Sequence, residues 1–180
     1  MNKLRLFFGI PLKEEIKEKI FEYLNKNKLL KKNYKWVQKE NYHITLKFLG
    51  DVSEDLIEKL EKVGEEVAST FNIFSLYTYE FGGFPDIKKA RVFFLSVKEV
   101  EKIERVFELL DNKLAHLNFE RERRKYHPHI TLARLREFES LPDLKPLELK
   151  LDIEGFSLYE SILKREGPSY KILKYFPFRR

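Results

Sequence analysis

Residues 42–50 read YHITLKFLG and residues 128–136 read PHITLARLR, so the tetrapeptide His-Ile-Thr-Leu occurs twice, beginning at His43 and at His129. In both copies a polar side chain alternates with an apolar one, which is the pattern of a half-buried β-strand. The His and Thr of each copy then share one face of the strand, about 7 Å apart, and the Ile and Leu point to the other. The two segments predict two strands that each present an imidazole beside a hydroxyl.

The two copies belong to a longer internal repeat, because His129 lies 86 residues after His43. The same offset superposes identical residues in the order strand, helix and His-containing strand. Among these pairs are Arg5 and Arg91, Phe7 and Phe93, Phe8 and Phe94, Phe21 and Phe107, Leu24 and Leu110, and Leu49 and Leu135. The repeat predicts two similar halves about a pseudo-two-fold axis, with one tetrapeptide on each wall of a groove between them.

Hydrophobic periodicity and turn residues predict the other elements. Helices are expected at 13–30, from an N-cap at Ser53 to about 69, and at 100–117. Strands are expected at 4–10, 71–81 (followed by a turn at Gly82-Gly83 and Pro85), 91–97, 129–135, 147–159 and 170–176. Residues 36–49 are expected to form an extended segment that ends in a strand closed by Gly50-Asp51.

Composition sets the outer limits. The chain has 180 residues with 43% hydrophobic residues, which suits one folded domain rather than a disordered chain. A net charge of +6 favours a phosphate-bearing partner. The absence of cysteine excludes a disulfide framework, a thiol nucleophile and a zinc–thiolate site. The apolar run at 4–10 is too short for a signal core or a membrane span, so we expect a soluble, cytoplasmic protein with no membrane partner.

Two imidazoles across a groove suit acid–base chemistry near neutral pH, because one can accept a proton from water while the other donates one to a leaving oxygen. Two threonine hydroxyls can hydrogen-bond the non-bridging oxygens of a phosphate between them. Phosphoryl transfer needs mainly positioning and charge stabilisation, so this set requires neither a metal nor another cofactor. A single His-x-Thr would be read as an ordinary strand, and an ancient duplication alone could preserve the pair. Folding, however, needs only the apolar Ile and Leu.

With these motifs the chain resembles the 2H phosphoesterase superfamily and, within it, the RNA 2′,3′-cyclic phosphodiesterases, also called 2′–5′ RNA ligases. The resemblance covers nearly the whole chain. It is carried by LRLFFGI, WVQKENYHITLKFLGDV, GGFPDIKKARVFFLSV, YHPHITLARL and GFSLYESILKREGPSYKIL.

The resemblance implies a single domain over residues 1–180 with an α+β fold. It should have two pseudo-symmetric lobes, each an antiparallel sheet with outer helices, around a central groove. It implies hydrolysis of an RNA 2′,3′-cyclic phosphate to a 2′-phosphomonoester. His43 would be the proton donor and His129 the proton acceptor. Thr45, Thr131 and Arg134 would hold the phosphate. From the repeat alone the roles of the two histidines are interchangeable.

Further candidates lie near the second motif. Arg134 is five residues after His129, so it faces away from the groove in a regular strand, and a bulge would be needed to turn it inward. Arg124 and Lys125 end a basic run that is either a solvated loop or a rim for RNA. His127 could contact substrate but also suits a plain loop position.

Aromatic residues near the first motif offer stacking surfaces for a base. Tyr34 and Tyr42 are candidates, whereas Trp36 is expected in the core. Phe48 would share the face of His43 only if its strand bends.

Three functions follow for comparison. The first is the cyclic phosphodiesterase. The second is a 2′–5′ RNA ligase that joins tRNA halves with 2′,3′-cyclic phosphate and 5′-hydroxyl ends. The third is a non-catalytic RNA- or nucleotide-binding module. In each case we expect a monomer with RNA as its partner.

Overall fold

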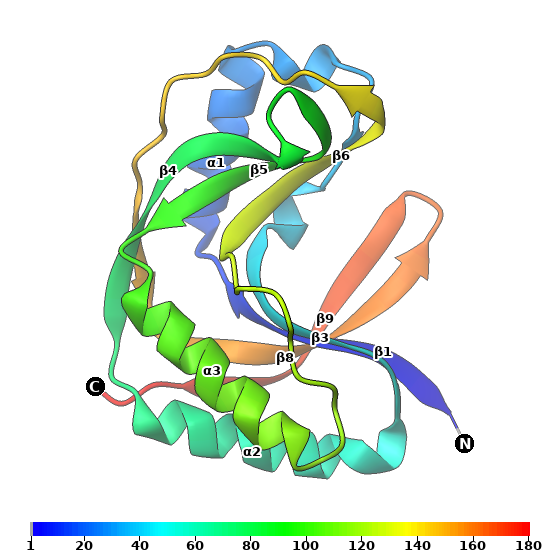
Figure 1. Cartoon of the computed structure of the whole chain (residues 1–180), viewed down its shortest axis with the longest axis vertical. Coiled ribbons are helices and arrows are strands. Elements are labelled where there is room, and N and C mark those ends of the chain that lie inside the picture. Colours follow the sequence, from blue (N-terminus) through cyan, green and yellow to red (C-terminus); the bar gives the residue numbers. More distant parts are fainter. Residues whose placement is uncertain (1) are drawn as a thin grey trace.

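One curled, nine-stranded sheet organises the computed structural model, which describes residues 2–180 (Figure 1). Its strand order is β7-β4-β5-β6-β3-β1-β8-β9, with β2 paired to β6, and neighbouring strands run antiparallel. The strands are β1 (Lys3–Pro11), β2 (Lys35–Trp36), β3 (His43–Ser53), β4 (Phe74–Asp86), β5 (Lys89–Lys98), β6 (His129–Glu139), β7 (Lys150–Ile153), β8 (Gly155–Lys164) and β9 (Gly167–Pro177).

The helices cover the outside of this sheet and are amphipathic. The α-helices are α1 (Glu14–Lys26), α2 (Ile57–Thr70) and α3 (Glu101–Ala115), and the short 3₁₀ turns are η1 (Leu29–Lys31), η2 (Lys39–Asn41) and η3 (Glu54–Leu56). The inward faces predicted from periodicity are buried, for example Ile20 on α1 and Leu110 on α3. Within residues 2–180, no helix combines the length and apolar character needed to cross a membrane.

The sheet consists of two halves that meet at the motif strands. One half is β3-β1-β8-β9, and the other is β6-β5-β4-β7 with β2. The halves join where Ile44 of β3 pairs with Ile130 of β6, and both of these side chains are fully buried. The predicted α+β fold of two antiparallel lobes is therefore confirmed.

The helices are exchanged between the halves. Helix α1 follows β1, yet it covers β4 and β5 of the other half, where Tyr23 stacks on Phe81 with ring centroids 4.8 Å apart (Figure 1). Helix α3 follows β5, yet it packs beside α2 and bonds to β3 through Asp111 and Lys47. Each repeat therefore completes the core of the other.

The predicted turn at Gly82-Gly83 is wrong, because β4 continues through these residues to Asp86. A Cβ on Gly82 would lie 2.7 Å from the ring of Phe94, and one on Gly83 would lie 2.6 Å from Leu141. These glycines thus allow close packing inside the strand rather than a reversal of the chain.

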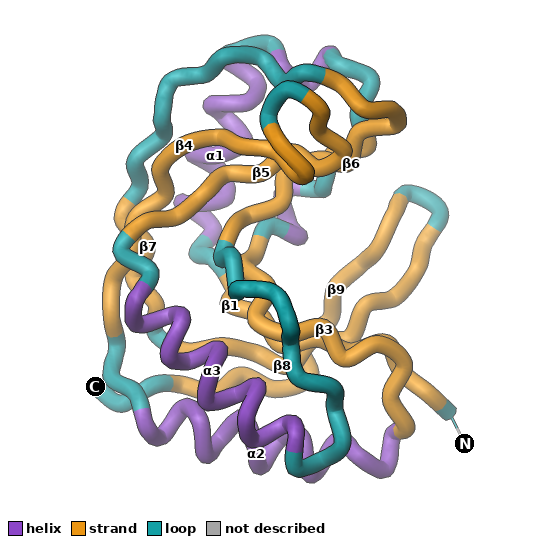
Figure 2. Tube along the Cα trace, viewed as in Figure 1, coloured by secondary structure: helices purple, strands orange, loops and turns teal. Residues whose placement is uncertain are grey.

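Two strand ends also differ from the predictions. Gly50-Asp51 does not close its strand, since β3 runs on to Ser53 and Gly50 takes a positive φ of 75° within it. The segment 147–159 is not one strand, because β7 ends at Ile153 and β8 begins at Gly155. The β8–β9 hairpin then extends well beyond the body of the sheet (Figure 2).

Candidate active site

The pairing of Ile44 with Ile130 fixes the geometry of the two motifs. In an antiparallel register this pair sets His43 across from Thr131, and Thr45 across from His129. Because residues alternate between faces, all four polar side chains lie on the face opposite the two buried isoleucines. The pseudo-two-fold axis of the repeat thus passes between two imidazoles and two hydroxyls.

The His43 ring is held by hydrogen bonds at both nitrogens. Its Nδ1 lies 2.7 Å from the main-chain oxygen of Asn41, which can only accept, so Nδ1 carries a proton. Its Nε2 lies 2.8 Å from the hydroxyl oxygen of Thr45. The ring also packs against Phe7 and Tyr170, with centroid distances of 5.1 Å and 5.2 Å. Nε2 is therefore the nitrogen that faces the groove.

His129 is oriented in the same way. Its Nδ1 donates to the main-chain oxygen of His127 at 2.6 Å, so Nε2 is again the nitrogen available for chemistry. The ring packs against Phe84 and Phe94, with centroid distances of 5.1 Å and 5.2 Å. The aromatic walls limit rotation of the imidazole and reduce its contact with water.

Burial lowers the pKa of both histidines. For His43 it lowers the pKa from 6.5 to about 4, although the hydrogen bond to the Asn41 carbonyl acts the other way. The nearby His129 adds to this lowering. Burial also lowers the pKa of His129; the hydrogen bond to the His127 carbonyl opposes this lowering, and the charges of His127 and Arg134 add to it. At neutral pH both rings are neutral in the free protein.

A β-bulge in each motif strand turns later side chains into the groove. The register of β6 against β5 shifts between Thr131 and Ala133, and Leu132 and Ala133 are both buried. Arg134 therefore lies on the same face as His129. The register of β3 against β1 shifts in the same way after Thr45, which brings Phe48 to the equivalent place. The bulge is recognised by two consecutive buried residues, after which the alternation of buried and exposed side chains along the strand is reversed.

These side chains line a pocket of about 470 Å³, here called the catalytic pocket. Its far wall is the tip of the β8–β9 hairpin, which brings Arg165 and Tyr170 to the motifs from the end of the chain. His129 does not line this pocket, but it lies two residues before Thr131 on the same face of β6. The lining residues are Lys35, Trp36, Val37, Gln38, Asn41, His43, Thr45, Phe48, Thr131, Arg134, Arg136, Arg165, Glu166, Gly167, Pro168 and Tyr170.

The aromatic residues near the first motif differ in whether they reach the catalytic pocket. Trp36 is partly buried and packs against the core, and it also lines the catalytic pocket; its Nε1 donates to the Lys32 oxygen at 3.1 Å. Tyr34 and Tyr42 are buried and do not line this pocket. Among residues 2–180, no group of three or more His, Asp or Glu side chains gathers where it could hold a metal ion.

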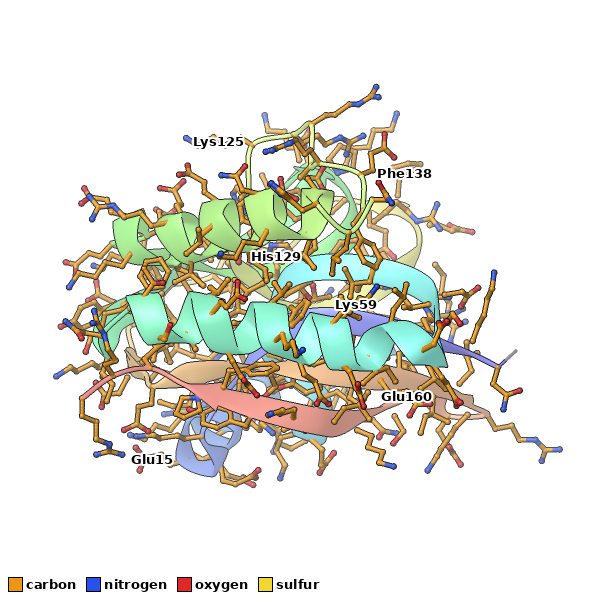
Figure 3. The ribbon with its side chains drawn as sticks, turned by 90° about the horizontal axis from the view of Figure 1, so that it is seen from below. Glu15, Lys59, Lys125, His129, Phe138 and Glu160 are labelled. Atoms are coloured by element: carbon orange, nitrogen blue, oxygen red, sulfur yellow. The ribbon has the colours of Figure 1, made fainter. Side chains whose placement is uncertain are left out.

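The basic run before the second motif lies on the loop from α3 to β6. Arg124 lines a separate pocket of about 530 Å³ on the outer side of Phe48. Lys125 is exposed at the edge of the molecule, whereas His129 lies further inward (Figure 3). The His127 ring is exposed and stands 5.9 Å from the His129 ring. Of these three residues, only His127 is beside the motif.

Two supports of the site were not predicted. The hydroxyl of Tyr126 donates to the main-chain oxygen of Thr45 at 2.8 Å and so ties the strand of one motif to the loop before the other. A buried ion pair joins Lys47 to Asp111 at 2.7 Å, and Lys47 also donates to the Glu120 oxygen at 2.6 Å. No repeated motif marks these contacts, since they connect the two halves.

Comparison with known proteins gives a consistent result. The model of the family LigT like Phosphoesterase matches residues 10–94 and residues 95–170, so each match contains one motif. The chain is similar to the RNA 2′,3′-cyclic phosphodiesterase of Thermotoga maritima, with 34% identity over 94% of this chain and 93% of the relative. It is 35% identical to that of Methanocaldococcus jannaschii over 95% of this chain and 99% of the relative.

Solved structures agree with the fold. The crystal structure of E. coli LigT complexed with 3′-AMP has a TM-score of 0.85 at 26% identity, covering 99% of this chain and 100% of that one. The crystal structure of the Thermus thermophilus protein TT0787 has a TM-score of 0.85 at 30% identity, covering 98% of each chain.

Proposed function

This chain belongs to the LigT-like phosphoesterase family, and from that premise we propose that it is a hydrolase that opens the 2′,3′-cyclic phosphate at the end of an RNA strand. The observation that carries the proposal is the pairing of Ile44 with Ile130, because this antiparallel register supports a site in which His43 faces Thr131 and Thr45 faces His129 across neighbouring strands. The names of the relatives support the same reaction and an RNA substrate.

In the proposed reaction, Nε2 of His129 accepts a proton from water as the water oxygen bonds to phosphorus. The bond between phosphorus and the 3′-oxygen breaks, and His43 Nε2–H protonates the departing oxygen. The product is a 2′-phosphomonoester, and solvent restores both histidines. Thr45, Thr131 and Arg134 hydrogen-bond the non-bridging oxygens and stabilise their charge in the transition state.

The donor role of His43 requires a proton that its buried ring lacks in the free protein. A bound phosphate carries a negative charge, and an opposite charge nearby favours the protonated imidazole. We propose that substrate binding raises the pKa of His43, so that its imidazole becomes protonated and can act as the proton donor. His129 needs no such change, because the neutral ring is already the form that accepts a proton.

Neither role calls for a metal ion, because the imidazoles supply acid and base while the hydroxyls and a guanidinium bind the anion. The test is an RNA oligonucleotide with a 2′,3′-cyclic end, incubated with the protein in EDTA. We expect complete conversion to the 2′-phosphate. A 3′-phosphate product would contradict the assignment of the leaving oxygen, and loss of turnover on chelation would contradict metal independence.

A second candidate is the joining of tRNA halves as a 2′–5′ RNA ligase. The site favours it because joining needs the same proton transfers as hydrolysis: His129 accepts the proton of the attacking hydroxyl as its oxygen bonds to phosphorus, and His43 protonates the departing 3′-oxygen. A ribose 5′-hydroxyl then takes the place of water. The ratio of joined to hydrolysed product, measured with cyclic-ended and 5′-hydroxyl tRNA halves, distinguishes the ligase reaction from hydrolysis.

We further propose that the protein acts as a monomer in the cytoplasm, because one chain supplies both motifs of the site. Sedimentation of the active protein at assay concentration should give a mass near 21.8 kDa. A dimer as the active species would contradict this proposal.

A further inference from the structure

We propose that a second pocket beside the catalytic pocket binds the nucleotide that precedes the cyclic-phosphate end, so that the protein recognises two successive nucleotides of a single strand. The inference rests on the proposed function and extends it from a phosphate to a substrate class. That class is oligonucleotides in preference to free nucleoside 2′,3′-cyclic phosphates.

The second pocket has a volume of about 480 Å³, which lies within the range of roughly 300–1,000 Å³ typical of small-ligand sites. Its lining residues come from β1, β3 and β6 and from the β8–β9 hairpin. Figure 1 shows how this hairpin stands out from the sheet next to β1 and β3. Four residues line both this pocket and the catalytic one, namely Phe48, Arg134, Pro168 and Tyr170. The two pockets are therefore adjacent, with this group as the partition between them.

The walls of the second pocket offer apolar surfaces suited to a nucleobase. Phe48 is 66% exposed and Leu163 is 79% exposed, unusually high values for large apolar side chains. The Phe48 ring is not isolated, because its centroid lies 5.7 Å from that of the buried Phe7. Bases stack on aromatic rings of this kind in proteins that bind single strands, largely without regard to sequence.

The charge of the second pocket matches a phosphodiester. Arg5 and Arg134 both line it, and none of its described lining residues is acidic. Both guanidinium groups act on the hydroxyl of Tyr170: burial raises the pKa of Tyr170, and the two arginines oppose that rise. The linkage between two nucleotides, seated at the partition, would meet both positive charges.

Arg5 has no structural task that explains it. Its repeat partner Arg91 donates from Nε to the Leu135 oxygen at 3.0 Å and stands over the ring of Phe138. Within residues 2–180, no hydrogen bond or ion pair is found for the guanidinium of Arg5. An unpaired arginine in a pocket next to a phosphate site is a ready ligand for another phosphate.

The experiment compares kcat/KM for adenosine 2′,3′-cyclic phosphate with kcat/KM for a diadenylate that carries the same cyclic end. We expect the wild type to prefer the dinucleotide by about ten-fold, the value of one stacked base. Arg5→Gln and Leu163→Ser should each reduce this preference several-fold and leave the mononucleotide rate within about two-fold. The matched control is Arg105→Gln, which removes the same charge from an exposed position on α3 and should keep the full preference.

The possible outcomes distinguish a failure of the proposed hydrolase activity from a failure of the second pocket as a nucleotide site. If the wild type hydrolyses neither substrate, the proposed function itself is wrong. If it hydrolyses both with equal kcat/KM, the second pocket is not a nucleotide site, although the function stands. If Arg5→Gln affects only the joining of a 5′-hydroxyl oligonucleotide, the pocket binds the other RNA end and the assignment to the same strand fails.

Discussion

His43 and His129 occupy equivalent positions at the start of their strands, and each bonds to the main-chain oxygen two residues before it. Their surroundings differ. Tyr170 and Phe7 pack against the first ring, while Phe84 and Phe94 pack against the second. Each Nδ1–H is bonded to a carbonyl, which fixes Nε2 as the reactive nitrogen on both sides. The proposed acid and base therefore sit in different environments, and differences in burial and in neighbouring charge are what shift the pKa values of such groups.

The first prediction concerns pH. Because both histidine pKa values are lowered in the free protein, that of His43 to about 4, the maximum of kcat/KM should lie below pH 6.5. In the substrate complex the phosphate favours protonated His43, so the maximum of kcat should lie at higher pH. Rates measured from pH 4 to pH 9 at low and saturating substrate check this. If kcat and kcat/KM reach their maxima at the same pH, substrate binding does not protonate His43.

The second prediction concerns the histidines themselves. His43→Ala and His129→Ala should each lower kcat by about 10²–10⁴-fold, the usual contribution of a general acid or base. The thermal midpoint should change by only a few degrees. His116→Ala is the matched control, because His116 is exposed at the end of α3. Equal activity of all three variants would exclude acid–base catalysis by the motifs.

At the scale of elements, the loop from α3 to β6 connects the two motifs. It leaves α3 after Ala115 and ends at His129 (Figure 2). Along it, the Glu120 oxygen accepts a hydrogen bond from Lys47, and Tyr126 donates one to the Thr45 oxygen. Asp111 also accepts from the Glu122 amide at 3.3 Å. The loop is thereby held to β3 at both ends, and the second motif strand starts from a fixed point.

The third prediction therefore concerns the buried ion pair. Lys47 and Asp111 are 7% and 8% exposed, so Asp111→Ala should lower the free energy of unfolding by about 3–5 kcal/mol, because it leaves an unpaired buried charge. Urea denaturation measures this. Lys47→Met combined with Asp111→Leu should recover much of the loss. In contrast, Glu148→Ala breaks the exposed pair with Lys98 and should cost under about 1 kcal/mol. Similar losses at both sites would contradict the assignment.

At the scale of the whole molecule, two exchanged helices and one continuous sheet make the halves interdependent. The two halves of the sheet pair with each other through the motif strands, so the groove is a consequence of how the sheet closes. The net charge of +6 gives the molecule a field that favours a polyanion such as RNA, and Arg134, Arg136 and Arg165 line the catalytic pocket.

The fourth prediction follows from that charge. Raising the salt concentration from 50 to 200 mM should lower kcat/KM for a cyclic-ended oligonucleotide. A plot of log(kcat/KM) against log[salt] should have a slope of about −0.7 for each phosphate contacted. The same change should affect a nucleoside 2′,3′-cyclic phosphate less, because it carries a single phosphate. Parallel salt dependence for the two substrates would show that only the terminal phosphate is bound.

Much of the fold and the centre of the site could be predicted from the sequence. The period-two pattern indicates which motif residues share a face, and the repeat indicates that two such strands come together. The orientation of Arg134 depends on a bulge, which a regular alternation does not predict. Tyr170 and Arg165 depend on tertiary structure, because the β8–β9 hairpin reaches the motifs from more than twenty residues beyond the end of β6. The glycines of β4 mislead because close packing and turns both favour glycine.

The pairing of Ile44 with Ile130 has a consequence for ancestry. Two separate copies of one half could meet at the same axis as a homodimer, but their histidines would then be identical and every substitution would appear twice. Fusion of the copies into one chain releases this constraint. Phe48 and Arg134 occupy equivalent places after their bulges, yet one offers an apolar ring and the other a charge. A single chain thus allows one wall of the pseudo-symmetric site to differ from the other.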